Sequence, residues 1–339
     1  MTTALDGLAV GLDRFVHVPA EFASYDTSAA DAARFLAVPP AQLDALAAAG
    51  LEHRPGADGD PRFDYVDLVN VATFAGGGRS VPELALRFLL RFAASPASTW
   101  YEPRDWEVTV RLPTMDGPVA VRVPDLAADG VAALPEQPGP AGVKTASPGT
   151  STSAGAEFVD HGYRSTVRLS GTAQTIRDPH VRAVWTDVVE TLRSGRVVYQ
   201  MVPESLRRQP ELAWSLGQAD CIVVARLLAA RIAALGQPTR ARRGYLLGLV
   251  GSDHAWCEVA EDGVWKSLDG IFAFVASGGG RERGFALDAP AFAHACAGSR
   301  FNRLLPCVGE DAAPLVLVDG QPAPPWALAG VGARPWRSA

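Results

Sequence analysis

The sequence predicts an α+β protein in two parts, a small and mainly helical N-terminal module and a larger mixed core. Three observations support this prediction. Helix-like apolar periodicity dominates up to residue 94, strict apolar-polar alternation follows in residues 100–123, and both patterns occur after residue 157. At 339 residues, the chain is long enough for each part to bury its own core.

The composition is that of a soluble globular protein, and the formal net charge of −6 argues against a general phosphate-binding surface. Residues 1–15 lack a basic region followed by an apolar run, so no signal peptide is expected. The most apolar helix, after Cys221, is interrupted by Arg226 and Arg231, so no membrane span is expected. We therefore expect a cytoplasmic protein.

The N-terminal module, residues 1–98, is predicted to contain four helices. Residues 27–50 form two short helices joined at two prolines, with Thr27 or Ser28 as the cap of the first. Two further helices are expected at Asp64–Phe74 and Val81–Ala94. The first pair has helix-turn-helix spacing.

Ala49-Gly50-Leu51, a loop, and then Phe63–Leu68 resemble the winged-helix head of MerR-type regulators. The resemblance implies DNA binding, whereas a small helical domain can also serve to pack or to dock a partner. Charge favours docking. Residues 1–95 hold twelve acidic side chains against seven arginines and no lysine, and DNA recognition requires neutralisation of phosphates first. We therefore expect the module to dock a partner protein and not to bind nucleic acid.

Residues 99–123 are predicted to form a β-hairpin around a turn at Met115-Asp116-Gly117, either as the wing of the module or as an added ribbon. Residues 124–156 are rich in proline, glycine, serine and threonine and hold few large apolar residues. Such a segment buries too little surface to order itself, so it is predicted to be a flexible linker.

Residues 157–339 are predicted to form the catalytic domain. Before Cys221 we expect a strand, an amphipathic helix, a short strand and a second helix, at Tyr163–Leu169, Pro179–Arg193, Val197–Tyr199 and Pro203–Leu216. After Asp269 we expect a mobile loop at Gly278–Gly280, a helix at Ala289–Ala297 and a strand at Leu315–Val318.

Asp220 is a candidate N-cap that places Cys221 in the first turn of a helix ending at Leu235. Unpaired N–H groups and the helix dipole at this end favour a thiolate over a thiol. The same N–H groups can stabilise the oxyanion that forms when a thiolate attacks a carbonyl. Cys221 is therefore a candidate nucleophile.

Alternation places His254, Trp256 and Glu258 on one face of the strand that follows. A tight turn at Glu261-Asp262-Gly263 returns the chain, so that antiparallel pairing brings Asp269 within reach of His254. A carboxylate fixes the imidazole tautomer, and the other ring nitrogen can face Cys221. Cys, His and Asp together form an activated thiol nucleophile.

The chain from about Pro179 to Gly270 resembles the transglutaminase-like superfamily, a circularly permuted relative of papain-type folds. The resemblance lies in order and spacing: Asp220-Cys221, Gly236–Arg240, Gly244-Tyr245, His254–Glu258 and Trp265–Asp269. It implies a transglutaminase-like (papain-like cysteine) core with Cys221 as nucleophile, His254 as base and Asp269 as its orienter. Gly270 stands where the family often has proline, and we expect a looser turn that keeps the carboxylate.

Candidate substrate-binding residues are Gln218, Arg240, Tyr245 and Trp256. Cys296 and Cys307 are interpreted as structural, and the four cysteines form no close pair of metal-ligand type. Cys257 should point away from the triad, which argues against a zinc site. No cofactor and no metal are expected.

The resulting hypothesis is a cysteine enzyme that forms a thioester and passes the acyl group to an amine or to water. The substrate would be a peptide, an amide or a carrier-bound acyl group, as in a biosynthetic pathway. Two alternatives stay open beside acyl transfer. One is an intracellular peptidase or amidase, and the other is a ligand-sensing or DNA-binding regulator whose transglutaminase-like domain is not catalytic.

Overall fold

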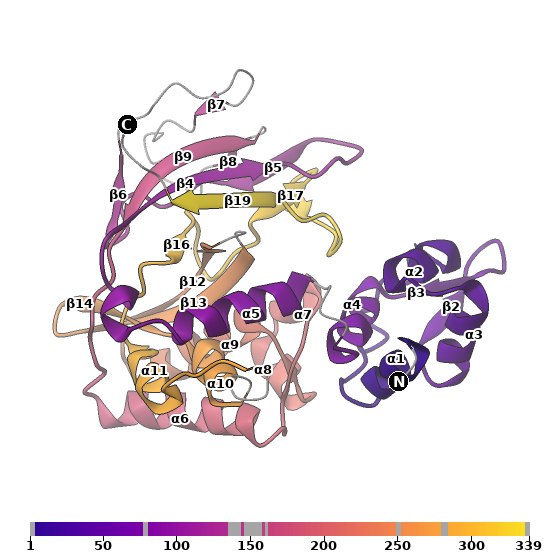
Figure 1. Ribbon diagram of the computed structural model, residues 1–339, viewed down its shortest axis with the longest axis horizontal. Coiled ribbons are helices and arrows are strands. Elements are labelled where there is room, and N and C mark those ends of the chain that lie inside the picture. Colours follow the sequence, from indigo (N-terminus) through magenta and orange to yellow (C-terminus); the bar gives the residue numbers. More distant parts are fainter. Residues whose placement is uncertain are drawn as a thin grey trace. The chain divides into compact units, whose positions relative to one another are not determined.

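The computed structural model describes residues 4–76, 81–134, 144–145, 158–159, 162–248, 252–278 and 284–335. It confirms the α+β class, because helices and mainly antiparallel sheets both build the chain (Figure 1). The chain divides into two compact units, Met1–Arg87 with Gly195–Val223, and Phe88–Ser194 with Val224–Ala339. This division differs from the predicted one, since the first unit stops before residue 98 and includes part of the predicted catalytic domain.

The first unit begins with a helical module. Its elements are α1 (Ala4–Leu12), β1 (Thr27–Ser28), α2 (Ala29–Leu36), α3 (Pro40–Ala48), β2 (His53–Pro55), β3 (Pro61–Phe63), α4 (Tyr65–Phe74) and the start of α5 (Val81–Ala93). The predicted helices are therefore confirmed to within a residue or two at each end. The hairpin β2–β3 joins β1 in a three-stranded sheet, in the order β1-β3-β2.

Side-chain caps explain where these helices begin. The Ser28 hydroxyl accepts a hydrogen bond from Asp31 N, and the Asp64 carboxylate accepts from Val66 N and Asp67 N. Both caps satisfy N–H groups that a helix start leaves unpaired. The module's core is apolar and includes Leu8, Leu12, Phe15, Ala32, Ala33, Leu36, Val38, Leu43, Leu46, Leu51, Phe63, Leu68 and Val71.

The second part of the first unit is the segment that leads to Cys221. It contains β10 (Val198–Tyr199), α7 (Glu204–Arg207), α8 (Pro210–Ser215), β11 (Gln218–Ala219) and the start of α9 (Cys221–Ala233). The prediction of one helix over residues 203–216 is wrong. Pro210 is the first residue of α8, and proline at this position has no N–H with which to continue α7.

Two amides join this segment to the helical module. Asn70, which is 1% exposed, donates from Nδ2 to Met201 O at 3.1 Å and accepts from Met201 N at 2.8 Å. Gln200 makes a similar pair of bonds to the main chain of Val16. The module and the segment therefore form one unit although more than a hundred residues separate them in the sequence.

The second unit contains the remaining helices and three sheets. The helices are the end of α5, η1 (Ala97–Trp100), α6 (Pro179–Arg193), the rest of α9, α10 (Gly270–Gly278) and α11 (Ala289–Ala295). The strands are β4 (Arg104–Arg111), β5 (Val119–Arg122), β6 (Val131–Ala133), β7 (Lys144–Thr145), β8 (Phe158–Val159), β9 (Tyr163–Leu169), β12 (Thr239–Leu246), β13 (Ser252–Glu261), β14 (Val264–Leu268), β15 (Ala297–Gly298), β16 (Leu304–Pro306), β17 (Val316–Val318), β18 (Gln321–Pro322) and β19 (Gly330–Pro335).

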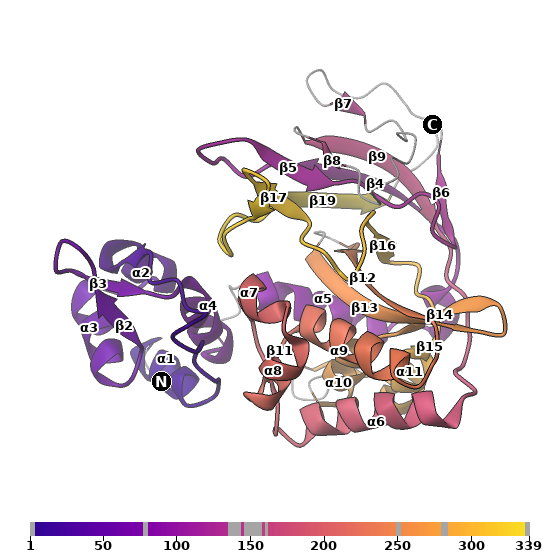
Figure 2. The same cartoon turned by 180° about the vertical axis from the view of Figure 1, so that it is seen from behind.

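The second unit is layered. Figures 1 and 2 show the sheet β15-β14-β13-β12-β16 with α6, α9, α10 and α11 on one face and the strands of the two other sheets on the opposite face. Those two sheets have the orders β19-β4-β9-β6 and β18-β17-β5-β8. A core of buried residues fills the space between the strands, including Trp106, Val108, Val121, Tyr163, Val167, Tyr245, Leu247 and Leu305.

The predicted hairpin over residues 99–123 is wrong, although both of its strands exist. β4 pairs with β9 on one edge and with β19 on the other, so β5 has no free edge of β4 to pair with. β5 instead pairs with β17 and β8. Alternation identifies a strand but says nothing about its partner.

The predicted linker, residues 124–156, is also partly wrong. β6 and β7 both fall within it, and both pair with β9. Backbone pairing with a formed sheet stabilises a segment that has few large apolar side chains. The rest of the predicted linker from residue 135 on, apart from β7, lies outside the described residues, as do Gly279 and Gly280 of the predicted mobile loop.

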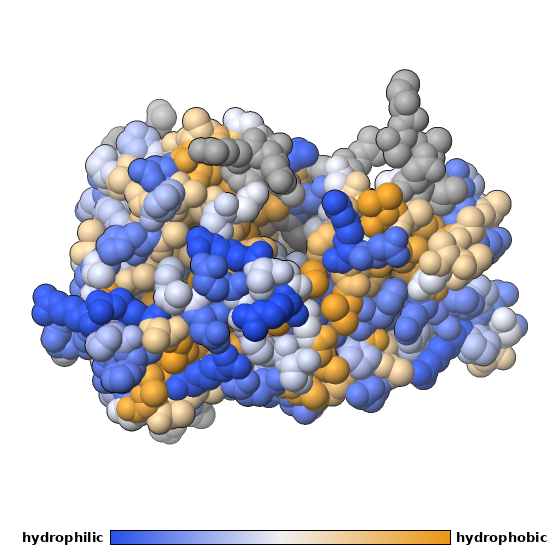
Figure 3. Space-filling model, turned by 90° about the horizontal axis from the view of Figure 1, so that it is seen from below, coloured by the Kyte–Doolittle hydropathy of each residue, from blue (hydrophilic) through white to orange (hydrophobic). Residues whose placement is uncertain are grey.

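Figure 3 shows hydrophilic residues over much of one face, interrupted by smaller hydrophobic areas. In the part of the chain that the structure describes, no helix combines the length and the apolar character needed to cross a bilayer.

Candidate active site

The segment from β10 to β11 leads to Cys221, the first residue of α9. The Asp220 carboxylate accepts hydrogen bonds from Ile222 N and Val223 N, both at 3.0 Å, which confirms Asp220 as the cap. Cys221 has intermediate exposure. The start of a helix carries the positive end of the helix dipole, which interacts favourably with negative charge.

Arg207 balances the charge of Asp220. Its Nε donates to Asp220 Oδ2 at 2.6 Å, and its Nη1 donates to Glu204 Oε2 at 3.1 Å. Arg207 and Asp220 are 14% and 8% exposed in their side chains, so solvent screens their contact only weakly. Arg207 was not among the predicted site residues, because nothing in its spacing from Cys221 indicates its contact with Asp220.

Gln218 lies three residues before Cys221 and is completely buried. Its Oε1 accepts a hydrogen bond from Gln200 Nε2 at 3.4 Å. Within the part of the chain that the structure describes, its Nε2 has no hydrogen-bond partner. A buried amide N–H₂ without a partner is unfavourable, which makes this group a candidate to bind a ligand's oxygen.

His254 and Asp269 belong to the second unit, and the structure brings them together. His254 Nε2 lies 2.7 Å from Asp269 Oδ2, and both side chains are buried, at 6% and 3% exposure. The antiparallel register of β13 and β14 sets this contact, since Cys257 is opposite Leu268. Asp269 is the residue directly after this last pair of the ladder, and its carboxylate reaches the His254 ring on β13.

Both residues of the pair are fixed by further contacts. Asp269 Oδ1 accepts from Phe272 N at 3.0 Å, so the carboxylate also caps α10, and Asp269 N donates to Cys296 O at 3.0 Å. The imidazole of His254 stacks on the Phe272 ring with centroids 4.5 Å apart and planes 20° apart. Phe272, which sequence reasoning missed, therefore holds the ring while its main chain holds the carboxylate.

Gly270 follows Asp269 as the first residue of α10. A Cβ at this position would lie 3.1 Å from Val224 Cγ1 of α9 and 3.8 Å from Leu228 Cδ1. The start of α10 thus packs closely against α9, and glycine is the residue that permits this approach. Val224 is one helical turn after Cys221 on α9.

The other candidate substrate-binding residues have different surroundings. The Trp256 indole donates to Glu258 Oε1 at 3.1 Å, and Arg240 Nε donates to Glu258 Oε2 at 2.6 Å. The Arg240 guanidinium also lies 4.2 Å from the centroid of the Trp265 ring. Tyr245 is a 2% exposed member of the core between the sheets, and burial raises its pKa well above the usual range. Arg240 and Tyr245 thus have roles in packing and ion pairing.

The remaining cysteines differ from Cys221 in burial. Cys257, Cys296 and Cys307 are buried free thiols, and burial raises the pKa of each one. A buried thiol with a raised pKa is a poor nucleophile. Among the described residues, no group of three or more histidines, cysteines or carboxylates could hold a metal ion.

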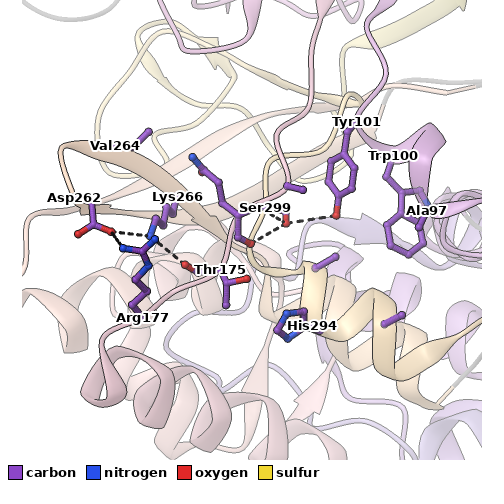
Figure 4. Close-up of a pocket in the computed structure, with 14 residues that line it drawn as sticks. Ala97, Trp100, Tyr101, Thr175, Arg177, Asp262, Val264, Lys266, His294 and Ser299 are labelled. Atoms are coloured by element: carbon purple, nitrogen blue, oxygen red, sulfur yellow. Dashed lines mark hydrogen bonds and ion pairs between the residues drawn. The ribbon is translucent and has the colours of Figure 1, made fainter.

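A hollow of about 700 Å³ lies elsewhere on the second unit. In Figure 4 the Ser299 hydroxyl lies near the Tyr101 hydroxyl, while Arg177 and Lys266 both approach Asp262. The charges at this end of the hollow are therefore paired. The residues that line the hollow include none of the predicted site residues.

No protein-family model matches the chain, and no curated protein matches it in sequence. Among solved structures, the chain is similar to the crystal structure of a "Putative Cysteine Protease from Cytophaga hutchinsonii". The TM-score is 0.36 at 12% sequence identity, and the match covers 70% of this chain and 92% of that chain. A likeness this distant supports no conclusion by itself, so the functional argument depends on the residues described above.

Proposed function

We propose that this protein is a cysteine-dependent enzyme that transfers an acyl group through a thioester, with Cys221 as nucleophile, His254 as base and Asp269 as the group that orients His254. The observation that carries the proposal is the buried hydrogen bond between His254 and Asp269. Burying an imidazole and a carboxylate in contact is costly, and catalysis is a common reason for such a pair.

The pair defines the chemistry of the imidazole. With its carboxylate at Nε2, Asp269 keeps the proton on that nitrogen, so Nδ1 is the atom that exchanges protons with the thiol. Asp269 also stabilises the imidazolium that forms when Nδ1 accepts the thiol proton. The helix start at Cys221 favours the resulting thiolate.

The reaction begins when the Cys221 sulfur forms a bond to the carbonyl carbon of the substrate. The carbonyl oxygen becomes negatively charged, and the Nε2 amide of Gln218 is a suitable donor to it. The carbon–nitrogen bond then breaks, and the leaving amine takes the proton held by His254. The product is a thioester on Cys221.

The second half of the reaction regenerates the free enzyme. Water or a second amine gives its proton to His254 and attacks the thioester, and the carbon–sulfur bond breaks. Water gives the reaction of an amidase or peptidase, and an amine gives amide transfer. Both outcomes use the same three residues, and access of water to the thioester decides between them.

The substrate class follows from the chemistry of the thiolate, which attacks amides and thioesters. We propose a peptide, an amide or a carrier-bound acyl group as substrate, and docking of a partner protein on the N-terminal module. The excess of acidic side chains in this module, about five over residues 1–95, favours a basic partner and disfavours nucleic acid.

The test is acylation of the intact protein by p-nitrophenyl acetate, a reactive ester that needs no substrate-specific recognition. We expect a single acetyl group on Cys221, seen by intact mass and located by peptide mapping. Cys221→Ala should abolish the adduct, while Cys257→Ala, which removes a buried thiol, should keep it. Equal acylation of wild type and Cys221→Ala would overturn the proposal.

A further inference from the structure

Gln200, a residue with no role in the triad, contacts the Gln218 side chain through its own amide. We propose that Gln200 is a positioning residue, held by the main chain of the N-terminal module, that turns the Gln218 N–H₂ group toward the substrate's carbonyl oxygen. This inference rests on the proposed function. It makes the helical module a structural part of the acyl-binding site.

The backbone fixes Gln200 beside Gln218. β10 and β11 pair in parallel with Val198 opposite Gln218, and Gln200 N donates to Ala219 O at 2.9 Å. Gln200 is 5% exposed, so its side chain depends on protein partners for its hydrogen bonds.

Val16 fixes the orientation of the Gln200 amide. Val16 N donates to Gln200 Oε1 at 2.8 Å, and Gln200 Nε2 donates to Val16 O at 2.6 Å. A main-chain N–H can only donate and a main-chain carbonyl can only accept. The oxygen and nitrogen of this side chain therefore cannot be exchanged without losing both bonds.

The fixed amide in turn orients Gln218. Gln200 Nε2 donates its second hydrogen to Gln218 Oε1, with the nitrogen and the oxygen 3.4 Å apart, so Gln218 uses its oxygen as the acceptor for this contact. Its Nε2 is then directed away from Gln200, and among the described residues this atom has no partner. An N–H₂ group held in this way is ready to donate when a negatively charged oxygen forms, without reorganisation.

Asn70 provides a matched control. Like Gln200, it is a buried amide that joins the module to the same segment through two main-chain bonds, here to Met201. These two bonds do not involve Gln218. A change at Asn70 therefore weakens the attachment of the module without reversing the Gln218 amide.

The experiment compares two reactions of Cys221 in the full chain. Alkylation by iodoacetamide displaces iodide at a saturated carbon and forms no oxyanion, whereas acylation by p-nitrophenyl acetate passes through one. The ratio of the two second-order rate constants therefore reports oxyanion stabilisation and not thiolate formation. A variant that merely loosens the fold changes both rates.

Gln200→Glu keeps an acceptor for Val16 N but loses both donors, so Gln218 should turn its N–H₂ toward the new carboxylate. We expect the acylation-to-alkylation ratio to fall by about a hundredfold, the lower end of the loss that follows removal of an oxyanion donor. Gln200→Met, which keeps the volume without charge, should lower the ratio less, and Asn70→Ser should leave it unchanged.

Gln218→Leu should lower the ratio as much as Gln200→Glu, and the double variant should be no worse than Gln218→Leu alone. A wild-type ratio in both Gln200 variants, or additive losses in the double variant, would overturn the positioning role while the Cys221 acylation stands. Absence of acylation in the wild type would overturn the proposed function itself.

Discussion

The Cys221 segment and the His254–Asp269 pair are stabilised in different ways. The positions of His254 and Asp269 are set by the backbone, because β13 and β14 are in register over five residue pairs and the turn into α10 begins at Asp269. The Cys221 segment depends on side chains instead. The contacts of Asp220, Arg207 and Gln200 set its cap, its charge and the direction of its amide.

This difference predicts how substitutions in the two regions affect activity. A ladder of main-chain bonds tolerates changes of single side chains, so the carboxylate and imidazole stay in contact unless one of them is replaced. Side-chain contacts can be changed one at a time, each with a partial effect. We therefore expect substitutions of His254 or Asp269 to cause large losses of activity, and substitutions around Cys221 to cause graded losses.

The largest effect is expected for Asp269→Asn. The new amide can still accept from Phe272 N, so the cap of α10 remains. Its N–H₂ would face His254 Nε2 and stabilise the tautomer that carries its proton on Nδ1, which cannot act as a base. Acylation of Cys221 should fall about 10³-fold to 10⁴-fold.

The measurement is the rate of p-nitrophenol release under single turnover, with circular dichroism to verify the fold. Val264→Ala, at an exposed position on β14, is the control. A loss of less than tenfold for Asp269→Asn would mean that the carboxylate caps α10 and does not orient the base.

An effect of intermediate size is expected for pH. The stability of the two units should change in opposite directions as pH rises. In the first unit, burial raises the pKa of Asp64 to about 6, and the hydrogen bond to Asp67 raises the pKa of His17. Above the unfolded-state values of 3.8 and 6.5, the folded state still holds protons that the unfolded state has released. Stability therefore falls as pH rises, by up to roughly 3 kcal/mol for Asp64 between pH 4 and 6.

In the second unit the sign is reversed. Burial opposes ionisation of Glu107, but its contacts with Arg164 and Arg334 outweigh burial and lower its pKa. Contacts with Lys266 and two main-chain N–H groups do the same for Glu261. These groups stabilise the fold above their unfolded pKa of 4.5, and the contribution is lost as pH falls through the lower folded value.

Hydrogen exchange of peptides from each unit, corrected for the intrinsic rate at each pH, measures this difference. We expect protection in the first unit to fall between pH 4 and 8 and protection in the second unit to fall below pH 4. Asp64→Asn, which keeps a cap, should flatten the response of the first unit. A parallel response of both units would contradict the assignment.

The smallest effect is expected for Arg207→Gln. Removing the guanidinium leaves the negative charge of Asp220 unbalanced beside the thiolate. An electrostatic change of about 1 kcal/mol corresponds to a loss of about fivefold in the alkylation rate of Cys221 at pH 7. Arg208→Gln, an exposed neighbour, is the control and should have no effect. Equal rates for the two variants would show that Arg207 has only a structural role.

Features set by nearby residues were predictable from the sequence. The caps Ser28 and Asp220 and the helix Pro179–Arg193 depend on groups within one or two turns. The contact between His254 and Asp269 was predictable for the same reason, since a single tight turn separates the two strands. Local propensity and a short loop leave few alternatives in such cases.

Features set by distant residues were not predictable. The partners of β4 come from residues 163–169 and 330–335, and no pattern within residues 99–123 indicates them. Arg207, Gln200 and Phe272 act at the candidate site through contacts that only the fold creates. Their side chains are ordinary for a surface or a core, so composition and spacing give no signal.

The pairing of β4 with β19 has a consequence for synthesis of the protein. During translation β4 emerges early, but the strand that covers one of its edges emerges only when residues 330–335 have left the ribosome. Until then that edge presents unpaired N–H and C=O groups to other nascent chains. Because such a non-local sheet is completed late, we expect the chain to aggregate more readily when β19 is removed.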